Sequence, residues 1–160
     1  VVAIKNKALE AYGEVKVASG VGSSDNVQLI QMLLDGLIEN LTAAEGQVHR
    51  VLTLKAGDEH REEIANKNKT LTRAANIVMG LQTALDHDKG GELAKNLNEL
   101  YAYVSRKIFT VNANNDLDAL KEIKGLMENI RSAWKQVPAL VPGAKSESKK
   151  NLSSSTRSAA

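Results

Sequence analysis

Apolar residues recur at α-helical spacing through four long stretches of this sequence, and short breaks rich in Gly, Asp and Asn separate them. No stretch sustains the two-residue alternation that marks a β-strand. We expect helices at about 25–54, 60–85, 92–112 and 116–137, with the break at 86–91 (DHDKGG) stopping the second of them. Four long helices joined by short loops predict an all-α fold, an antiparallel four-helix bundle.

Two aspartates open helices in this prediction. Asp25 is the expected N-cap of the first long helix, with Gln28 as its capping-box partner three residues later. Asp116 is the expected N-cap of the last helix, which should end near Val137, just before Pro138. Four large side chains are expected in the core: Trp134, Leu97, Leu100 and Tyr101.

The chain is long enough for one packed core, because 160 residues with 42% hydrophobic content suffice for a single domain. We divide it into an N-terminal segment at 1–18, a Gly/Ser hinge at 19–24, the helical bundle at 25–137 and a disordered tail at 138–160. The N-terminal segment is expected to form a short additional helix that caps the bundle.

Net charge separates the bundle from the tail. Residues 143–160 carry four Lys or Arg and one Glu, whereas residues 1–142 carry 17 Lys or Arg and 18 Asp or Glu. The overall charge of +2 therefore comes from the tail, which we interpret as a flexible or vector-derived segment, with a weak polyanion or partner contact as the alternative. A folded part with net charge −1 argues against a nucleic-acid-binding domain.

The residue types typical of catalytic and metal sites are either absent or lack the spacing that such sites need. There is no cysteine, and none of the three histidines follows a Glu at the spacing of a di-metal bundle site. The Asp86-His87-Asp88 triplet next to Gly90 is better explained by turn formation than by metal binding. We therefore expect no enzyme activity, no cofactor and no metal. No apolar run is long enough to span a bilayer and no signal peptide is visible, so we expect no membrane insertion, and a cytoplasmic location is permitted.

Several apolar residues lie off the core stripe of their own helix. They are Leu29, Met32 and Gly36 on the first long helix, Ile77 on the second, and Tyr103 and Phe109 on the third. A surplus of this kind is what a helix-binding surface requires. The alternative is a five-segment fold in which neighbouring segments cover these residues, since single exposed apolar residues are common.

Six segments carry a resemblance to a known family. They are LIQMLLDG at 29–36, AANIVMGL at 74–81, GGELAKNLNELYAY at 90–103, IFTVNANND at 108–116, SAW at 132–134, and ALEAYGEV at 8–15. In their order along the chain and in their spacing, these segments resemble the flagellar secretion chaperone family, FliS. The family's usual capping turn before the first long helix is replaced by Asp25-Asn26-Val27, and the last 18 residues correspond to nothing in the family pattern.

The resemblance implies a non-enzymatic export chaperone of the bacterial cytosol. It implies that the bundle binds the C-terminal segment of flagellin, prevents premature polymerisation and presents the complex to the flagellar export gate. It also leaves room for a homodimer when the protein is free. The alternative is a structural or signalling bundle that self-associates through the same apolar residues and is indifferent to flagellin.

Roles follow for individual residues. Leu29, Met32, Gly36, Ile77 and Tyr103 are expected to line client grooves, and the expected polar anchors are Gln31, Asp35, Asn76 and Asn96. For Asn76 and Asn96, capping or bridging of neighbouring helices is an equal alternative. The expected displaceable cap consists of Ile4, Leu9 and Tyr12, with permanent packing in the core as its alternative.

Overall fold

The structure is a computed structural model that describes residues 23–136, and within them the chain forms four α-helices and no strand. The helices are α3 (Ser23–Thr53), α4 (Asp58–Thr83), α5 (His87–Asn114) and α6 (Leu117–Trp134). The all-α four-helix prediction is therefore confirmed. The expected N-terminal cap helix, with Ile4, Leu9 and Tyr12, and the tail after residue 136 lie outside the described residues.

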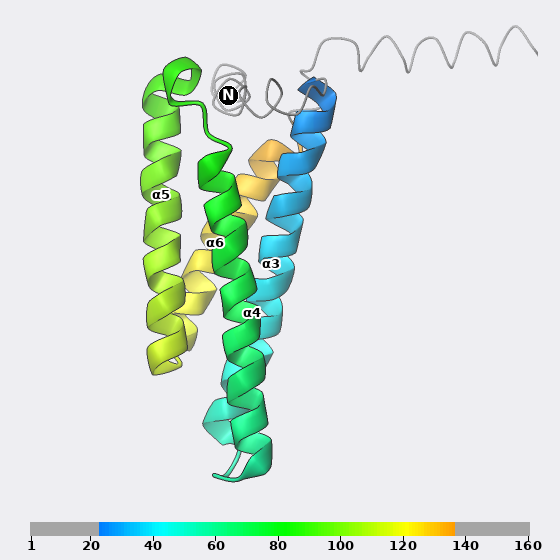
Figure 1. Ribbon diagram of the computed structural model, residues 1–160, viewed down its shortest axis with the longest axis vertical. Helices are drawn as coiled ribbons and strands as arrows, with labels where there is room; N and C mark the ends of the chain where they lie inside the picture. The colour runs from blue at the N-terminus through cyan, green and yellow to red at the C-terminus, as the bar shows by residue number, and fades with distance from the viewer. Residues whose placement is uncertain (1–22, 137–160) are drawn as a thin grey trace, which may run out of the picture.

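Each helix runs antiparallel to the one before it (Figure 1). α3 packs against α4 and α6, and α5 also packs against α4 and α6, so the four helices surround one core. α6 crosses obliquely behind α4 and reaches the upper part of α3, while the lower ends of α3 and α4 extend past α5 and α6 (Figure 1). This arrangement leaves outward-facing surfaces along the α3–α4 and α4–α5 pairs.

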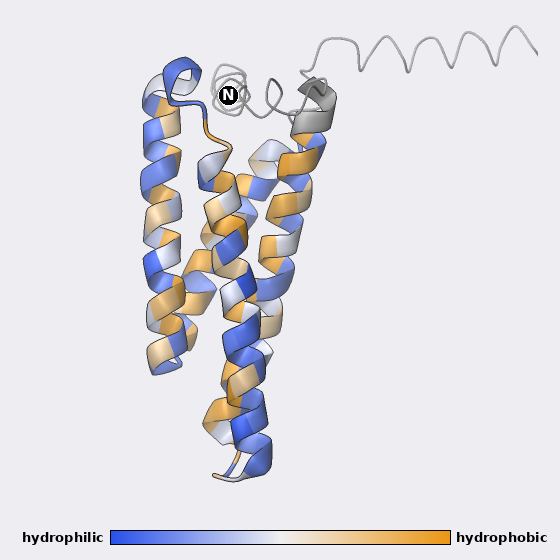
Figure 2. Cartoon of the chain, in the orientation of Figure 1, coloured by the Kyte–Doolittle hydropathy of each residue, from blue (hydrophilic) through white to orange (hydrophobic). Residues whose placement is uncertain are grey.

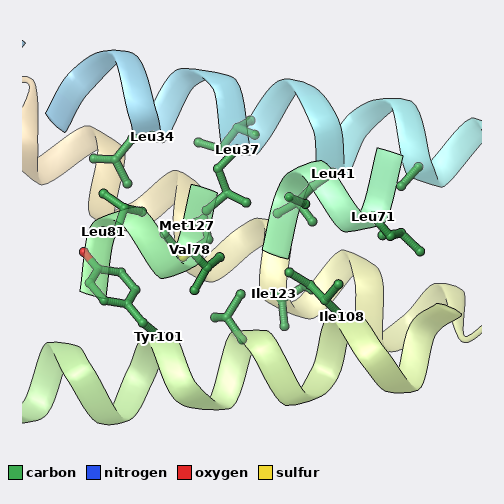
Figure 3. Close-up of a cluster of buried hydrophobic side chains, with 14 of the residues drawn as sticks. Leu34, Leu37, Leu41, Leu71, Val78, Leu81, Tyr101, Ile108, Ile123 and Met127 are labelled. Atoms are coloured by element: carbon green, nitrogen blue, oxygen red, sulfur yellow. The ribbon is translucent and has the colours of Figure 1, made fainter. Parts of the chain in front are cut away.

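The core is built from the apolar stripes of all four helices. Hydrophobic and hydrophilic residues alternate around each helix, as helices buried on one side require (Figure 2). The close-up shows Leu34, Leu37 and Leu41 of α3 facing side chains of the other three helices (Figure 3). Burial of this aliphatic surface is the main force that holds the bundle together. The other core residues labelled in Figure 3 are Leu71, Val78, Leu81, Tyr101, Ile108, Ile123 and Met127.

The four residues predicted in the core, three on α5 and Trp134 on α6, divide into two groups. Tyr101 is fully buried, and Trp134 of α6 is buried as well, so both predictions are confirmed. Leu97 is half-buried and packs against the core from its edge. Leu100 is also only half-buried and is not part of the buried cluster.

One predicted N-cap is confirmed and one is wrong. The Asp116 side chain accepts a hydrogen bond from the Ala119 amide at 3.0 Å, which caps α6 as expected. α3 begins at Ser23, so Asp25 lies inside the helix rather than at its N-cap. α6 ends at Trp134, three residues earlier than predicted.

The predicted break at 86–91 is a helix start rather than only a helix stop. Oδ1 of Asp86 accepts hydrogen bonds from the amides of Asp88 and Lys89 at 3.1 and 3.0 Å, so a helical turn begins directly after Asp86. Gly91, with φ 51° and ψ −127°, then kinks the chain before the main part of α5. A side chain at Gly91 would be strained at this positive φ.

A buried lysine joins the middle of α4 to the end of α5. Nζ of Lys67 donates to the Asn112 carbonyl at 2.9 Å and to Oδ1 of Asn115 at 2.8 Å. Asn115 adopts the left-handed conformation, φ 54°, that ends α5. The ammonium therefore satisfies an otherwise unpaired carbonyl at the helix terminus. Its burial lowers the pKa of Lys67 below the ordinary value.

Candidate functional site

The N-terminal half of α3 exposes two large apolar side chains. Leu29 is 41% exposed and Met32 is 66% exposed, whereas Ile30 and Leu34 on the opposite side of the same turns are fully buried. Helical geometry places Leu29 and Met32 on neighbouring positions of one outer face. This face offers aliphatic surface to a partner without disturbing the core.

A glycine lies next to this face, at the contact between α3 and α4. A Cβ atom placed on Gly36 would lie 3.6 Å from Cδ1 of Ile77, so Gly36 lies directly beside the Ile77 side chain. Gly36 is one turn after Met32, and Ile77 is half-buried at the edge of the core. The structure thus brings four predicted residues together, and we call Leu29, Met32, Gly36 and Ile77 the α3–α4 surface.

The predicted polar anchors surround this surface unevenly. Gln31 and Asp35 are half-buried on α3, and Oδ1 of Asp35 lies 3.5 Å from Nη1 of Arg131 on α6. Asp35 therefore lies on the α6 side of α3 and already has a cationic partner. Asn76 is exposed on α4, directly before Ile77.

Tyr103 and Asn96 lie on a different side of the bundle. The Tyr103 hydroxyl donates a hydrogen bond to Glu122 of α6, and Nζ of Lys107 lies 5.7 Å from the centre of the Tyr103 ring. The hydrogen bond to Glu122, together with desolvation, raises the pKa of Tyr103 above its ordinary value. Asn96 is exposed two helical turns earlier on the same side of α5. These two residues do not join the α3–α4 surface.

A second apolar surface was missed as a site by sequence reasoning. A shallow groove of about 210 Å³ runs between α4 and α5, and Phe109 at its edge is 77% exposed. Met79, 61% exposed, lies on the same side of α4 as two groove residues, Thr72 and Ala75. The position of Phe109 off its helix stripe was the available signal, while Met79 was hidden inside an almost continuous apolar run. The groove is lined by Leu71, Thr72, Ala75, Ser105, Ile108, Phe109 and Asn112.

Charged side chains in the part of the chain that the structure describes form ion pairs, such as those of Lys124 with Glu45 and Glu128. Within residues 23–136 there is no group of three or more His, Asp or Glu side chains placed to hold a metal ion. Asp86 of the Asp-His-Asp triplet instead serves as a helix cap. None of the helices from α3 to α6 is long and apolar enough to cross a membrane.

The fold and the surface together define the class of protein: an antiparallel four-helix bundle that exposes aliphatic residues on the outer side of α3 (Figure 1). Comparison with known proteins gives the family. Residues 8–140 match the family described as Flagellar protein FliS. The chain therefore belongs to the FliS family of flagellar secretion chaperones, as the sequence motifs predicted.

Individual relatives agree with this assignment. The chain is 42% identical over 130 residues to the flagellar secretion chaperone FliS of Salmonella typhimurium, covering 81% of this chain and 88% of that protein. It is 35% identical over 131 residues to FliS of Escherichia coli, covering 81% and 88% of the two chains. It is 34% identical over 128 residues to FliSB of Pseudomonas aeruginosa, covering 80% and 93%. Membership of this family supports a role as a flagellar export chaperone.

Proposed function

We propose that this protein binds the C-terminal segment of flagellin on the α3–α4 surface, prevents its premature polymerisation and delivers it to the export gate. The observation that carries the proposal is the exposure of Leu29 and Met32 beside Gly36 in a member of a flagellar secretion chaperone family. The proposed location is the bacterial cytosol, where the client is made. No catalytic step is part of this function.

The physical argument concerns the cost of ordering the client. A disordered segment that folds on binding loses conformational entropy, and burial of apolar surface has to offset that loss. Met32 and Leu29 supply aliphatic surface, while Gly36 allows a client backbone to approach α3 closely. Gln31 and Asn76 are proposed to bond to polar groups of the client backbone, and Asp35 is proposed as an anchor despite its contact with Arg131.

The proposal also includes two groups of predicted residues outside the α3–α4 surface: Asn96 with Tyr103, and the N-terminal segment. Asn96 and Tyr103 lie on the α5–α6 side, so they would contact the client only if it extends around the bundle. The N-terminal segment with Ile4, Leu9 and Tyr12 is proposed to cover the α3–α4 surface until the client arrives. Deletion of residues 1–18 should leave the bundle folded, and a cooperative loss of helicity would instead identify the segment as core.

The direct experiment is isothermal titration calorimetry of the full chain with two segments of one flagellin. The C-terminal segment should bind at micromolar concentration or below, with a negative heat-capacity change from apolar burial. An N-terminal segment of equal length is the matched control and should bind at least tenfold more weakly. Equal binding of both segments, or no binding of the C-terminal one, would contradict the proposal.

The exposed Phe109 and Met79 give a reason to test self-association as well. We propose that the free protein forms a homodimer that contains this face and dissociates when flagellin binds. Sedimentation velocity with and without the flagellin segment checks this. A stable dimer that ignores flagellin would favour the alternative function, a structural or signalling bundle.

A further inference from the structure

Sulfur occurs in this chain only in methionine. The sequence contains three methionines and no cysteine, so no thiol competes for an oxidant. Oxidation converts the apolar thioether of methionine into a polar sulfoxide, and sulfoxide reductases restore the thioether. Because all three methionines lie among the described residues, the structure shows which of them an oxidant in solution can reach.

The fold separates the three methionines by exposure. Met32 on α3 is 66% exposed and Met79 on α4 is 61% exposed, whereas Met127 of α6 is fully buried. Met127 lies among the core side chains shown in Figure 3. An oxidant has to reach the sulfur atom, so Met32 and Met79 should react in the folded protein, and Met127 should react only when the bundle opens.

Each of the two exposed apolar surfaces carries one of the accessible methionines. Met32 lies beside Leu29 on the α3–α4 surface, and Met79 lies on the α4–α5 side together with Phe109. Met32 is the most exposed member of the α3–α4 surface, and it does not belong to the buried core cluster. Oxidation of Met32 would therefore make this surface more polar and leave the core packing intact.

We propose that Met32 is a reversible oxidation site, and that its sulfoxide weakens client binding at the α3–α4 surface. With hydrogen peroxide as the oxidant, the sulfur atom gives two electrons to the O–O bond and takes one oxygen atom, and the second oxygen leaves as water. In the reverse step two thiols are oxidised to a disulfide, and the sulfoxide oxygen leaves as water. The effect on the client rests on the proposed function, whereas the selective oxidation of Met32 and Met79 rests on their exposure.

The size of the effect follows from desolvation of the sulfoxide oxygen. In the free protein this oxygen is hydrated, because most of the Met32 side chain is exposed. A client that covers Met32 removes this water. Burial of a polar group without a hydrogen-bond partner changes a dissociation constant roughly 5- to 150-fold, so oxidation of Met32 should weaken client binding by a factor in this range.

Peroxide treatment of the full chain, followed by peptide mass spectrometry, shows where oxidation occurs without any client. Met32 and Met79 should react at similar rates, and Met127 should react roughly tenfold more slowly or slower still. In denaturing urea all three should react at similar rates, because the fold no longer protects Met127. Protection of Met32 in the folded protein, or reaction of Met127 at the rate of Met32, would overturn the proposal.

Calorimetry with the C-terminal segment of flagellin measures the effect on binding, and two variants assign it. In Met79→Leu, Met32 is the only exposed methionine, so peroxide should weaken binding roughly 5- to 150-fold. Methionine sulfoxide reductase with dithiothreitol should restore the affinity. In Met32→Leu, peroxide should change the affinity by less than about twofold relative to the same variant before treatment.

The remaining outcomes separate the oxidation site from the proposed function. Equal losses of affinity in the two variants, or retained binding after full oxidation of Met32, would overturn the proposal and leave the proposed function standing. A lower urea midpoint of oxidised Met79→Leu would trace the loss to unfolding and would overturn the proposal as well. Failure of the untreated chain to bind the flagellin segment would refute the proposed function, and the regulation of binding with it.

Discussion

Truncation of one exposed methionine tests where the client binds. Met32 is 66% exposed in the free protein, so a client that covers it removes most of its side chain from water. Full burial of a methionine side chain contributes about 1.5–3 kcal/mol, and two thirds of that is about 1–2 kcal/mol. Met32→Ala should therefore weaken binding of the flagellin C-terminal segment roughly 5- to 30-fold, by the relation between free energy and dissociation constant.

The chain supplies a matched control for this change. Met79 has the same side chain and nearly the same exposure, 61%, but it lies on the α4–α5 side of the bundle. Met79→Ala should change the dissociation constant less than Met32→Ala, and both variants should unfold in urea within about 0.5 kcal/mol of the parent because neither side chain is in the core. Calorimetry and urea titration provide the two measurements. An equal or larger loss of binding in Met79→Ala would refute the assignment of the client to the α3–α4 surface.

Three other changes test the fold and the surface. Leu37→Ala removes a fully buried side chain and should lower the free energy of unfolding by about 2–5 kcal/mol in guanidinium titrations. Burial lowers the pKa of Lys67, so between that value and its ordinary 10.5 the unfolded chain holds more protons and stability should rise with pH. Lys67→Met should abolish this rise in urea titrations at increasing pH. Gly36→Ala should stabilise α3 by up to about 1 kcal/mol but weaken client binding, whereas Gly46→Ala, with open space around it, should stabilise without affecting binding.

Helical periodicity was sufficient to predict the four helices because their apolar stripes are long and regular. The cap at Asp116 was also predictable, since a local side-chain bond to Ala119 decides it. The segment at 86–91 was not, because glycines and aspartates are compatible both with a stop and with a new helix. Here the Asp86 side chain bonds to the amides after it, so a helical turn forms before Gly91 bends the chain.

The candidate site was only partly predictable for a geometric reason. A helical wheel shows that a residue leaves its own stripe, but it does not show which neighbouring helix the residue then meets. Met32 is exposed to solvent. Tyr103 instead donates a hydrogen bond to Glu122 of α6 and so lies on another side of the bundle. Lys67 was unpredictable for the same reason, because its partners Asn112 and Asn115 are more than 40 residues away in the chain.

The size of each exposed surface constrains the shape of a client. A micromolar complex needs about 8 kcal/mol of binding free energy, whereas covering one exposed side chain such as Met32 contributes about 1–2 kcal/mol. Leu29 and Met32 together cannot reach that value, because the client also loses entropy on ordering. The other exposed large apolar residues of the described part of the chain lie elsewhere: Leu52 is near the end of α3, and Met79 and Phe109 belong to the α4–α5 side. A client that binds at micromolar concentration must therefore make further contacts beyond these two side chains, and an extended chain segment can reach more of the surface around α3 than a compact domain can.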